Sequence, residues 1–480
     1  MPNRRQRSFS QITFKNKDQI LIHALSNGND KKDLKMSPLA IIKSFPKDFI
    51  FGTATSSYQI EGSSFGGCGK SHWDSFATKP KATYNYENGG TACNHIEHWK
   101  TDLNLIADAG FAAYRFSFSW PRLFVDGKTT KNNQGFSFYD QLLDGMLDRG
   151  ILPFATLYHW DLPQNLADRG GWTNRDTCKW FADYTESIMQ AFGDRLHSIA
   201  TINEPWCVSW LSHYLGHHAP GLRTLESAAR SMHLILVAHS KALEVIRSFN
   251  QENVGIVLNK EYMAPASGRE EDIVACKLSD EIYNLWFDEA IFRGQYPANT
   301  LKLFDQYMPE GFEEDLPSIN QKLDWVGLNY YTRSIIKADK SEKNVGFTTF
   351  AGQLPKTEMG WEIFPEGLTK LINRQVANYS KNTPIHITEN GMAGQDKRCV
   401  NSEVVDDNDR ITYYRLHLEE LKALLDDNIP IKGYFAWSLL DNFEWTFGYQ
   451  KKFGLVRVDY NTQKRVPKSS FYAFKNALRK

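Results

Sequence analysis

The 480-residue sequence predicts an α/β fold, a single (β/α)8 TIM barrel with elaborated loops at its C-terminal rim. From Phe45 onward, short runs of β-branched and aromatic residues alternate with longer amphipathic stretches, a pattern typical of repeated βα units and a parallel sheet. Eight such short runs are present, and no linker, repeat or low-complexity segment divides the chain. We therefore expect one barrel domain over residues 45–480.

Each predicted strand is a short apolar run, and each predicted helix has apolar residues at every third or fourth position. In chain order, the strands are expected at Phe51–Tyr58, Ala113–Ser119, Leu152–Tyr158, Ser198–Ile202, Val254–Asn259, Trp325–Tyr330, Ile385–Thr388 and Ile431–Trp437. Helices of the outer ring are expected at Thr177–Phe192, Leu225–Phe249 and Ile411–Asp427.

The N-terminal residues differ from the rest of the chain. Residues 1–44 are interpreted as an extension, compatible with flexibility, and Met36 is a candidate natural start. Arg4 and Arg5 are not followed by an apolar segment, so a secretory signal is not expected. No apolar run approaches the roughly 20 residues that cross a bilayer, so we expect a cytoplasmic protein without a membrane partner.

Composition restricts the classes of partner. Lysine plus arginine and aspartate plus glutamate both number 56, so no net charge favours nucleic acid or anionic lipid. Six cysteines lack metal-ligand or CxxC spacing, and we expect them to be reduced and mostly buried. Cys207 lies close to Glu204, where a catalytic thiol is the alternative to simple packing, and packing is the better interpretation.

Polar side chains follow the predicted strands at their C-terminal ends, where this type of barrel carries its active site. Any single one could be an ordinary hydrogen-bonded group at a strand end, but seven of the eight strand ends carry one. The residues concerned are Gln59, Glu61, Arg115, His159, Asp161, Asn203, Glu204, Asn329, Tyr331, Glu389, Asn390 and Trp437.

Two glutamates lie in short motifs directly after the fourth and seventh strands. They are Glu204 in Thr-Ile-Asn-Glu-Pro (201–205) and Glu389 in Ile-Thr-Glu-Asn-Gly (387–391). With His-Trp-Asp-Leu-Pro (159–163) and the stretch 437–445, these motifs occur in an order that resembles glycoside hydrolase family 1, from about Phe45 to the C-terminus. The resemblance implies a retaining β-glucosidase that removes terminal non-reducing β-D-glucosyl residues and needs no cofactor or metal.

The resemblance also implies the roles of the two glutamates. Glu389 would be the nucleophile, with Arg115 and Tyr331 supporting it, and Glu204 would be the acid/base that donates the proton. In retaining enzymes the two carboxyl groups lie about 5 to 5.5 Å apart, and the attacking one forms a covalent glycosyl-enzyme. Glu204 must start protonated, so we expect its pKa to be raised by burial and by the neighbouring carboxylate.

Further residues would bind the sugar, by the same resemblance. They are Gln59, His159, Trp160, Asn203, Asn329, Tyr331, Trp437, Glu444 and Trp445. Glu444 would repel a 6-phosphate, which argues against a 6-phospho-β-glycosidase. Trp206, His213, His217, Asn259 and the segment 341–357 would shape the leaving-group side.

Several functions stay open at this level. Side activity on β-galactosides or β-fucosides is expected, and a β-galactosidase or a transglycosidase of the same family is the alternative. A catalytically inactive sugar-binding barrel is the alternative from another class, although both glutamates are present. The expected partner is a small-molecule β-glycoside or oligosaccharide, and the oligomeric state, including a homo-oligomer, stays open.

Overall fold

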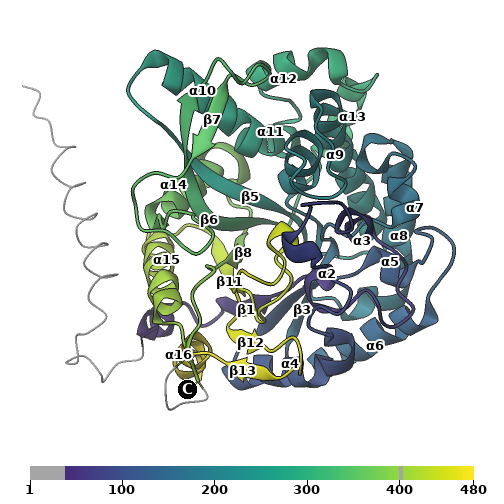
Figure 1. Ribbon diagram of the computed structural model, residues 1–480, viewed down its shortest axis with the longest axis vertical. Helices are drawn as coiled ribbons and strands as arrows, with labels where there is room; N and C mark the ends of the chain where they lie inside the picture. Colours follow the sequence, from purple (N-terminus) through teal and green to yellow (C-terminus); the bar gives the residue numbers. More distant parts are fainter. Residues whose placement is uncertain (1–37, 399–403, 480) are drawn as a thin grey trace, which may run out of the picture.

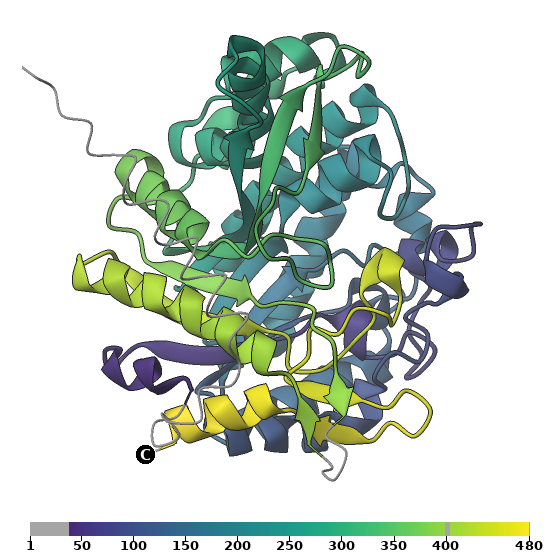
Figure 2. The same ribbon diagram turned by 60° about the vertical axis from the view of Figure 1, so that its left-hand side comes forward.

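Parallel strands form a closed barrel at the centre of the chain, surrounded by helices (Figures 1 and 2). The computed structural model describes residues 38–398 and 404–479. Most of the predicted N-terminal extension (residues 1–37), including Met36, and also Cys399 lie outside the described residues. Within the described part, neighbouring strands follow the order β5-β4-β3-β2-β1-β11-β8-β6, and β5 also pairs with β6, which closes the barrel. The predicted (β/α)8 architecture is confirmed.

The strands agree closely with their predicted positions at the start of each run. Their bounds are β1 Ile50–Ala54, β2 Ala113–Ser117, β3 Leu152–Tyr158, β4 Ser198–Asn203, β5 Val254–Pro265, β6 Trp325–Ala338, β8 Ile385–Asn390 and β11 Ile431–Trp437. Their side chains are buried at nearly every position within the barrel, because helices cover the outer face and side chains fill the inner one.

Three strands, β1, β5 and β6, end well away from their predicted positions. The first predicted strand continues to Tyr58, but β1 ends at Ala54, and Ser57–Ile60 form the short helix α2. The residues of α2 are buried as completely as those of the strand, so burial does not mark the change from strand to helix. The second difference is that β5 and β6 extend beyond the barrel and pair there as a parallel ribbon, with β7 (Phe347–Phe350) antiparallel to β6.

The helices of the outer ring bury one face each against the strands or one another. The predicted helices are present as α8 (Asp176–Phe192), α9 (Leu225–Ser248) and α15 (Asn408–Asp426). The other helices of at least seven residues are α4 His95–Ala109, α6 Asn133–Leu147, α10 Glu270–Asp280, α11 Trp286–Arg293, α12 Ala298–Phe304, α13 Phe312–Ile319, α14 Pro365–Gln375 and α16 Ser469–Leu478. No helix among the described residues is long and apolar enough to span a membrane.

Aromatic rings close the lower part of the barrel. Phe154 of β3 lies 4.9 Å from Phe435 of β11 and 5.7 Å from the His386 ring of β8, measured between ring centroids. β3 is a neighbour of neither β11 nor β8 in the sheet, so the Phe154 ring meets the other two rings across the barrel interior. The barrel is therefore a packed core below and opens only towards the C-terminal ends of its strands.

Candidate active site

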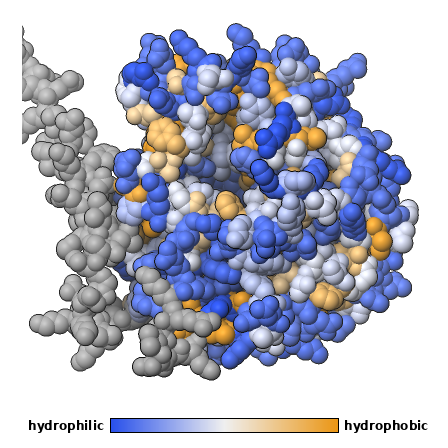
Figure 3. All heavy atoms as spheres, in the orientation of Figure 1, coloured by the Kyte–Doolittle hydropathy of each residue, from blue (hydrophilic) through white to orange (hydrophobic). Residues whose placement is uncertain are grey.

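A cavity of about 510 Å³ lies at the C-terminal end of the barrel strands, and the surface in Figure 3 is hollowed near the middle of the face. Nine of the residues predicted for the site line this cavity: His159, Trp160, Glu204, Asn329, Tyr331, Glu389, Trp437, Glu444 and Trp445. Gln59, Arg115 and Asn203 are buried directly behind the lining and bond to it. The structure thus brings together all of the residues predicted to be catalytic or to bind the sugar.

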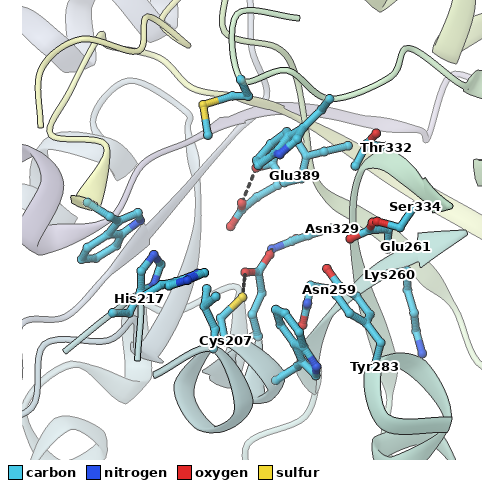
Figure 4. A pocket seen from close by; sticks show the side chains of 18 of the residues that line it. Cys207, His217, Asn259, Lys260, Glu261, Tyr283, Asn329, Thr332, Ser334 and Glu389 are labelled. Atoms are coloured by element: carbon cyan, nitrogen blue, oxygen red, sulfur yellow. Dashed lines mark hydrogen bonds between the residues drawn. The ribbon is translucent and has the colours of Figure 1, made fainter. Parts of the chain in front are cut away.

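Glu389 ends β8 and accepts one hydrogen bond on each carboxylate oxygen. Arg115 donates from Nη1 to Oε1 over 2.6 Å, and Tyr331 donates from its hydroxyl to Oε2 over 2.6 Å. Figure 4 shows the place of Glu389 in the cavity. Arg115 lies in the middle of β2 rather than at its end, and its long side chain spans the difference. Charge-assisted bonds of this length favour the ionised carboxylate and fix its orientation.

Glu204 follows β4 directly and has a different environment. Asn329 donates to its Oε1 over 2.7 Å and Cys207 donates to its Oε2 over 3.1 Å. Burial raises the pKa of Glu204 to about 8, and the charge of Glu389 contributes in the same direction. This is the shift expected from the sequence, and it comes from the predicted causes. A carboxyl group with this pKa carries its proton at neutral pH.

Buried amides join the two glutamates. The Asn203 side-chain oxygen accepts from Arg115 over 2.7 Å and from Asn329 over 3.1 Å. Because a guanidinium can only donate, the orientation of the Asn203 amide is fixed, and Asn329 must present its NH2 group to both Asn203 and Glu204. Thr388 donates to the remaining Asn329 oxygen over 2.7 Å. The network therefore fixes which groups donate and which accept at both carboxylates.

His159 completes the network on the other side of Asn203. Its Nε2 lies 3.2 Å from the Asn203 amide nitrogen, so Nε2 accepts. Burial and the nearby charge of Arg115 lower the pKa of His159 well below its usual value, which keeps the ring neutral. The proton then lies on Nδ1, an atom with no hydrogen-bond partner among the described residues.

Aromatic rings and a third glutamate form the wall beyond β11. The Trp437 ring stacks near His159, with 5.9 Å between centroids, and Trp445 lies 4.6 Å from Trp160. Glu444 precedes Trp445, and burial, followed by the charges of Glu389 and Glu204, raises its pKa to about 8. Gln59 reaches towards Glu444 over 3.5 Å and donates to the Phe443 carbonyl over 2.9 Å. The wall combines apolar ring faces with a carboxyl group.

Three residues of the lining have left-handed backbone conformations without being glycine. The φ angles are 79° at Trp160, 51° at Glu204 and 51° at Trp445. Such conformations cost about 1–3 kcal/mol each and tend to gather at functional sites. They lie in the segments that follow β3, β4 and β11, where their side chains line the cavity, and residue types alone carry no signal for them.

Some predicted residues lie elsewhere. Glu61 belongs to a buried structural pair, in which Arg122 donates to it over 2.6 Å and Tyr139 over 2.7 Å. Asn390 bonds the Tyr330 carbonyl, and Asp161 and His213 are buried outside the cavity lining. For His213, predicted on the leaving-group side, this is a correction: it lies on the helical turn η5 (Cys207–Tyr214) and its ring turns away.

The rest of the cavity lining was predicted only in part. Trp206, His217 and Asn259 line the cavity as expected, and segment 341–357 contributes Thr349, Phe350 and Ala351. Sequence reasoning missed Glu261, Tyr283, Ser334, Trp361 and Phe453, all of which also line it. Glu261 and Ser334 lie beyond the predicted ends of their strands, so only the extended pairing of β5 with β6 would have located them. No cluster of metal-ligating side chains occurs in the described part of the chain.

Comparison with known proteins gives one consistent result. Residues 41–480 match the family model for glycosyl hydrolase family 1. A 1,4-β-D-glucan glucohydrolase of Thermotoga neapolitana is 44% identical over 442 residues, which cover 91% of this chain and 99% of the relative. A bifunctional β-D-glucosidase/β-D-fucosidase of Bifidobacterium breve is 40% identical, with 89% of this chain and 96% of the relative covered.

Solved structures agree with this result. The family 1 β-glucosidase of Thermotoga maritima superposes with a TM-score of 0.87 at 42% identity, over 90% of this chain and 97% of that one. The β-glucosidase from the same organism in complex with deoxynojirimycin gives the same TM-score and identity, with 98% of that chain covered. The likeness therefore extends over almost all of the described residues.

Proposed function

The chain belongs to glycosyl hydrolase family 1 and is a glycoside hydrolase that acts on O-glycosyl bonds, and we propose that it is a retaining β-glucosidase that removes terminal non-reducing β-D-glucosyl residues. The observation that carries this proposal is the contrast between two glutamates in one cavity. Glu389 accepts two strong hydrogen bonds that favour its charge, whereas the pKa of Glu204 is raised to about 8. Opposed environments of this kind separate a nucleophile from an acid.

In the proposed first step, a Glu389 carboxylate oxygen attacks the anomeric carbon while Glu204 gives its proton to the departing glycosidic oxygen. The bond from the anomeric carbon to that oxygen breaks, and an ester to Glu389 forms. The charge of Glu389 is thereby lost, and with it the repulsion that helps to keep the pKa of Glu204 high. Glu204 can then ionise and remove a proton from the water that opens the ester.

Arg115 and Tyr331 would support the nucleophile. Both bond Glu389 over 2.6 Å, so the carboxylate cannot rotate without losing two charge-assisted bonds. Burial and the charge of Glu389 raise the pKa of Tyr331 well above its usual value, which keeps its hydroxyl proton available for donation. When the ester is hydrolysed, Glu389 becomes negatively charged again, and Arg115 and Tyr331 would again stabilise that charge by hydrogen bonds.

The glucosyl unit is proposed to bind between Trp437, Trp445 and Glu444. A pyranose presents an apolar C–H face to the rings and hydroxyl groups to a carboxyl group and to the free His159 Nδ1. Gln59 and Asn203 lie behind this lining, where they bond Glu444 and Asn329. Trp160 and Asn329 are the remaining residues proposed to bind the glucosyl unit. A phosphate would add negative charge beside the buried carboxyl group of Glu444, which already lies within the influence of the Glu389 charge, so we propose an unphosphorylated sugar.

The catalytic domain is proposed to be residues 45–480, which include both glutamates and the complete barrel. Activity on β-D-fucosides is proposed in addition, because the Bifidobacterium breve relative is named for both activities. A β-D-galactoside belongs in the same test, since it differs from the glucoside only in the direction of one hydroxyl group.

The test follows the hydrolysis of 4-nitrophenyl β-D-glucoside, galactoside and fucoside, with the α-D-glucoside as control. We expect the β-glucoside to be preferred and the first glucose released to be the β-anomer, as detected by NMR before mutarotation. Release of the α-anomer first would rule out the two-step mechanism. A higher kcat/KM for the galactoside would rule out the name β-glucosidase, and activity on the α-glucoside alone would contradict the whole proposal.

A further inference from the structure

Glu261 is a carboxylic acid of the cavity lining for which the proposed mechanism has no role. It lies on β5 where that strand leaves the barrel, next to a shift in pairing that sets Lys260 opposite Tyr330 but Tyr262 opposite Arg333. Irregularities of this type re-aim side chains next to active sites. In Figure 4, Glu261 lies together with Ser334 and Tyr283 on one side of the cavity that also receives Glu389.

This side of the cavity is opposite the wall proposed for glucose. In the closed barrel, β5 is four strands away from β1, whereas Gln59 and Glu444 follow β1 and β11. In contrast, β5 pairs directly with β4, which carries Glu204. The group that receives the proton of Glu204 is the leaving group, so Glu261 lies on the leaving-group side of the bond to be broken.

The backbone of Glu261 is held rigidly. Asn284, in the helical turn η6 (Glu281–Leu285), donates to the Glu261 carbonyl over 2.8 Å and accepts from its N–H over 3.3 Å. The same Asn284 nitrogen is held by Asp280 over 2.6 Å. Ser334 donates to Oε1 of Glu261. Because Glu261 lies on one of two paired strands and is held by these hydrogen bonds, its position is fixed before a ligand binds, unlike that of a residue on a mobile loop.

Within residues 38–398 and 404–479, no lysine or arginine forms an ion pair with the carboxyl group of Glu261. Its neighbour Lys260 points away from the cavity and pairs with Asp288 over 2.6 Å, and Arg333 pairs with Glu362 over 2.6 Å (Figure 4). Burial raises the pKa of Glu261 above its usual value. The Ser334 hydroxyl donates to Oε1 of Glu261, and the Tyr283 side chain also hydrogen-bonds the carboxyl group. An ionised carboxylate has about four acceptor sites, so Glu261 keeps the capacity to accept a further hydrogen bond from a ligand.

The rest of this wall is aromatic. The rings of Trp206 and Tyr283 lie 4.2 Å apart between centroids, and Phe350 is 44% exposed at the rim. Ring faces together with one strong acceptor suit a molecule that has apolar C–H faces and hydroxyl donors, which is a sugar. A purely apolar alcohol would cover the carboxyl group without replacing its hydrogen bonds, which carries a free-energy penalty.

We propose that Glu261 is a specificity-determining residue that accepts a hydrogen bond from a hydroxyl group of the leaving group, so that the enzyme selects β-glucosides of sugars over β-glucosides of apolar alcohols. This inference rests on the proposed β-glucosidase function. It adds the chemical class of the leaving group and the residue that recognises it.

The test compares cellobiose with hexyl β-D-glucoside. Both release an aliphatic alcohol, so the chemical step is similar, but only cellobiose releases a sugar. In the Glu261→Gln and Glu261→Ala variants, we expect the ratio of kcat/KM for cellobiose to that for hexyl glucoside to fall about tenfold or more, because a hydrogen bond to a charged acceptor is lost. The loss should appear mainly as a higher KM for cellobiose. Ser334→Ala should give a smaller fall.

Glu271→Gln is the matched control, since Glu271 is an exposed glutamate of α10 outside the cavity, and its ratio should equal that of the wild type. Thermal unfolding checks that each variant is folded. An unchanged ratio in folded Glu261→Gln, or a wild type that prefers hexyl glucoside, overturns the inference while leaving the β-glucosidase proposal intact. If the wild type hydrolyses neither glucoside but cleaves another glycoside, both proposals fail.

Discussion

The Cys207 thiol donates a hydrogen bond to Oε2 of Glu204, with 3.1 Å between sulfur and oxygen. The other oxygen of Glu204 faces the NH2 group of Asn329, which can only donate. The acidic proton of Glu204 must therefore lie on Oε2, beside the sulfur. A thiol is a weak donor and a weak acceptor, so Cys207 can keep its contact with Oε2 in either protonation state of Glu204. Burial raises the pKa of the thiol well above its usual value, so it stays protonated.

Removing this thiol should change the pH profile. A donor to the ionised carboxylate lowers its pKa, so Cys207→Ala should raise the pKa of Glu204 and move the alkaline limb of kcat/KM to higher pH by about half a unit, as expected for a weak bond to a charged group. Cys178→Ala is the control, because that buried thiol bonds the Leu234 carbonyl over 3.2 Å instead. Equal shifts in both variants would show that Cys207 acts only through packing.

The wild-type enzyme should lose activity as the pH rises through about 8. Glu204 must be protonated in the free enzyme to act as an acid, and its pKa is about 8. The limb should appear in kcat/KM for an alkyl glucoside, whose leaving group needs the proton. It should be weak for 2,4-dinitrophenyl β-D-glucoside, whose leaving group does not. An equally steep limb for both substrates would assign this pKa to another group.

The two glutamates should be distinguishable by substitution. In Glu204→Ala we expect a loss of roughly 10²–10⁴-fold for alkyl glucosides but a far smaller loss for the first step with 2,4-dinitrophenyl glucoside. Azide should accelerate turnover of this variant and yield the β-glucosyl azide, because a small anion can attack the ester without a general base. Glu389→Ala should lose roughly 10⁴-fold or more with every β-glucoside. Retention of activity by Glu389→Ala would contradict its role as the nucleophile.

Tyr331→Phe should weaken the nucleophile without removing it. The variant loses one hydrogen bond of 2.6 Å to a charged oxygen, which corresponds to about 1.5–3 kcal/mol, or a fall of roughly 10- to 100-fold in kcat. Single-turnover measurements with 2,4-dinitrophenyl glucoside would report the glycosylation step directly. Tyr472→Phe, at an exposed position on α16, provides the comparison and should behave as the wild type.

Substitution of Glu444 should make the protein more stable at alkaline pH. Its pKa is about 8 in the folded state and near 4.5 otherwise, so between these values the unfolded state ionises while the folded state stays protonated. The contribution of Glu444 to the free energy of unfolding therefore falls as the pH rises from about 4.5 to 8. Glu444→Gln removes the effect, and we expect a gain of about 1–3 kcal/mol at pH 8 but little at pH 5. Thermal unfolding at both pH values checks this, and an equal gain at both would contradict the explanation.

The barrel and much of its site could be predicted because buried strands and helices have regular patterns of apolar residues in the sequence. The strands at 152–158 and 431–437 have the predicted bounds, since apolar runs between turn signals define buried parallel strands well. The end of β1 was missed because α2 is equally buried. The ends of β5 and β6 were missed because their extension is half exposed, and their pairing with each other depends on contacts between distant segments.

The site could be predicted where a residue follows a strand end and belongs to a short motif, as for Glu204 and Glu389. The orientation of the side-chain groups in the site could not be predicted. The left-handed conformation of Trp160 and the direction of the Asn329 amide depend on a network that starts at Arg115, in the interior of β2. Glu261 has no motif of its own, and its place in the cavity follows only from the irregular pairing of two strands.

The rings of Phe154, Phe435 and His386 leave the barrel no exit at its base. A glucosyl unit bound against Trp437, as proposed, could therefore depart only past the place that the first product occupied. The order of events follows: the alcohol leaves first, water or a second alcohol arrives by the same route, and glucose leaves last. An enzyme built in this way should be inhibited competitively by glucose, and concentrated acceptors should divert the glucosyl-enzyme towards new glycosides.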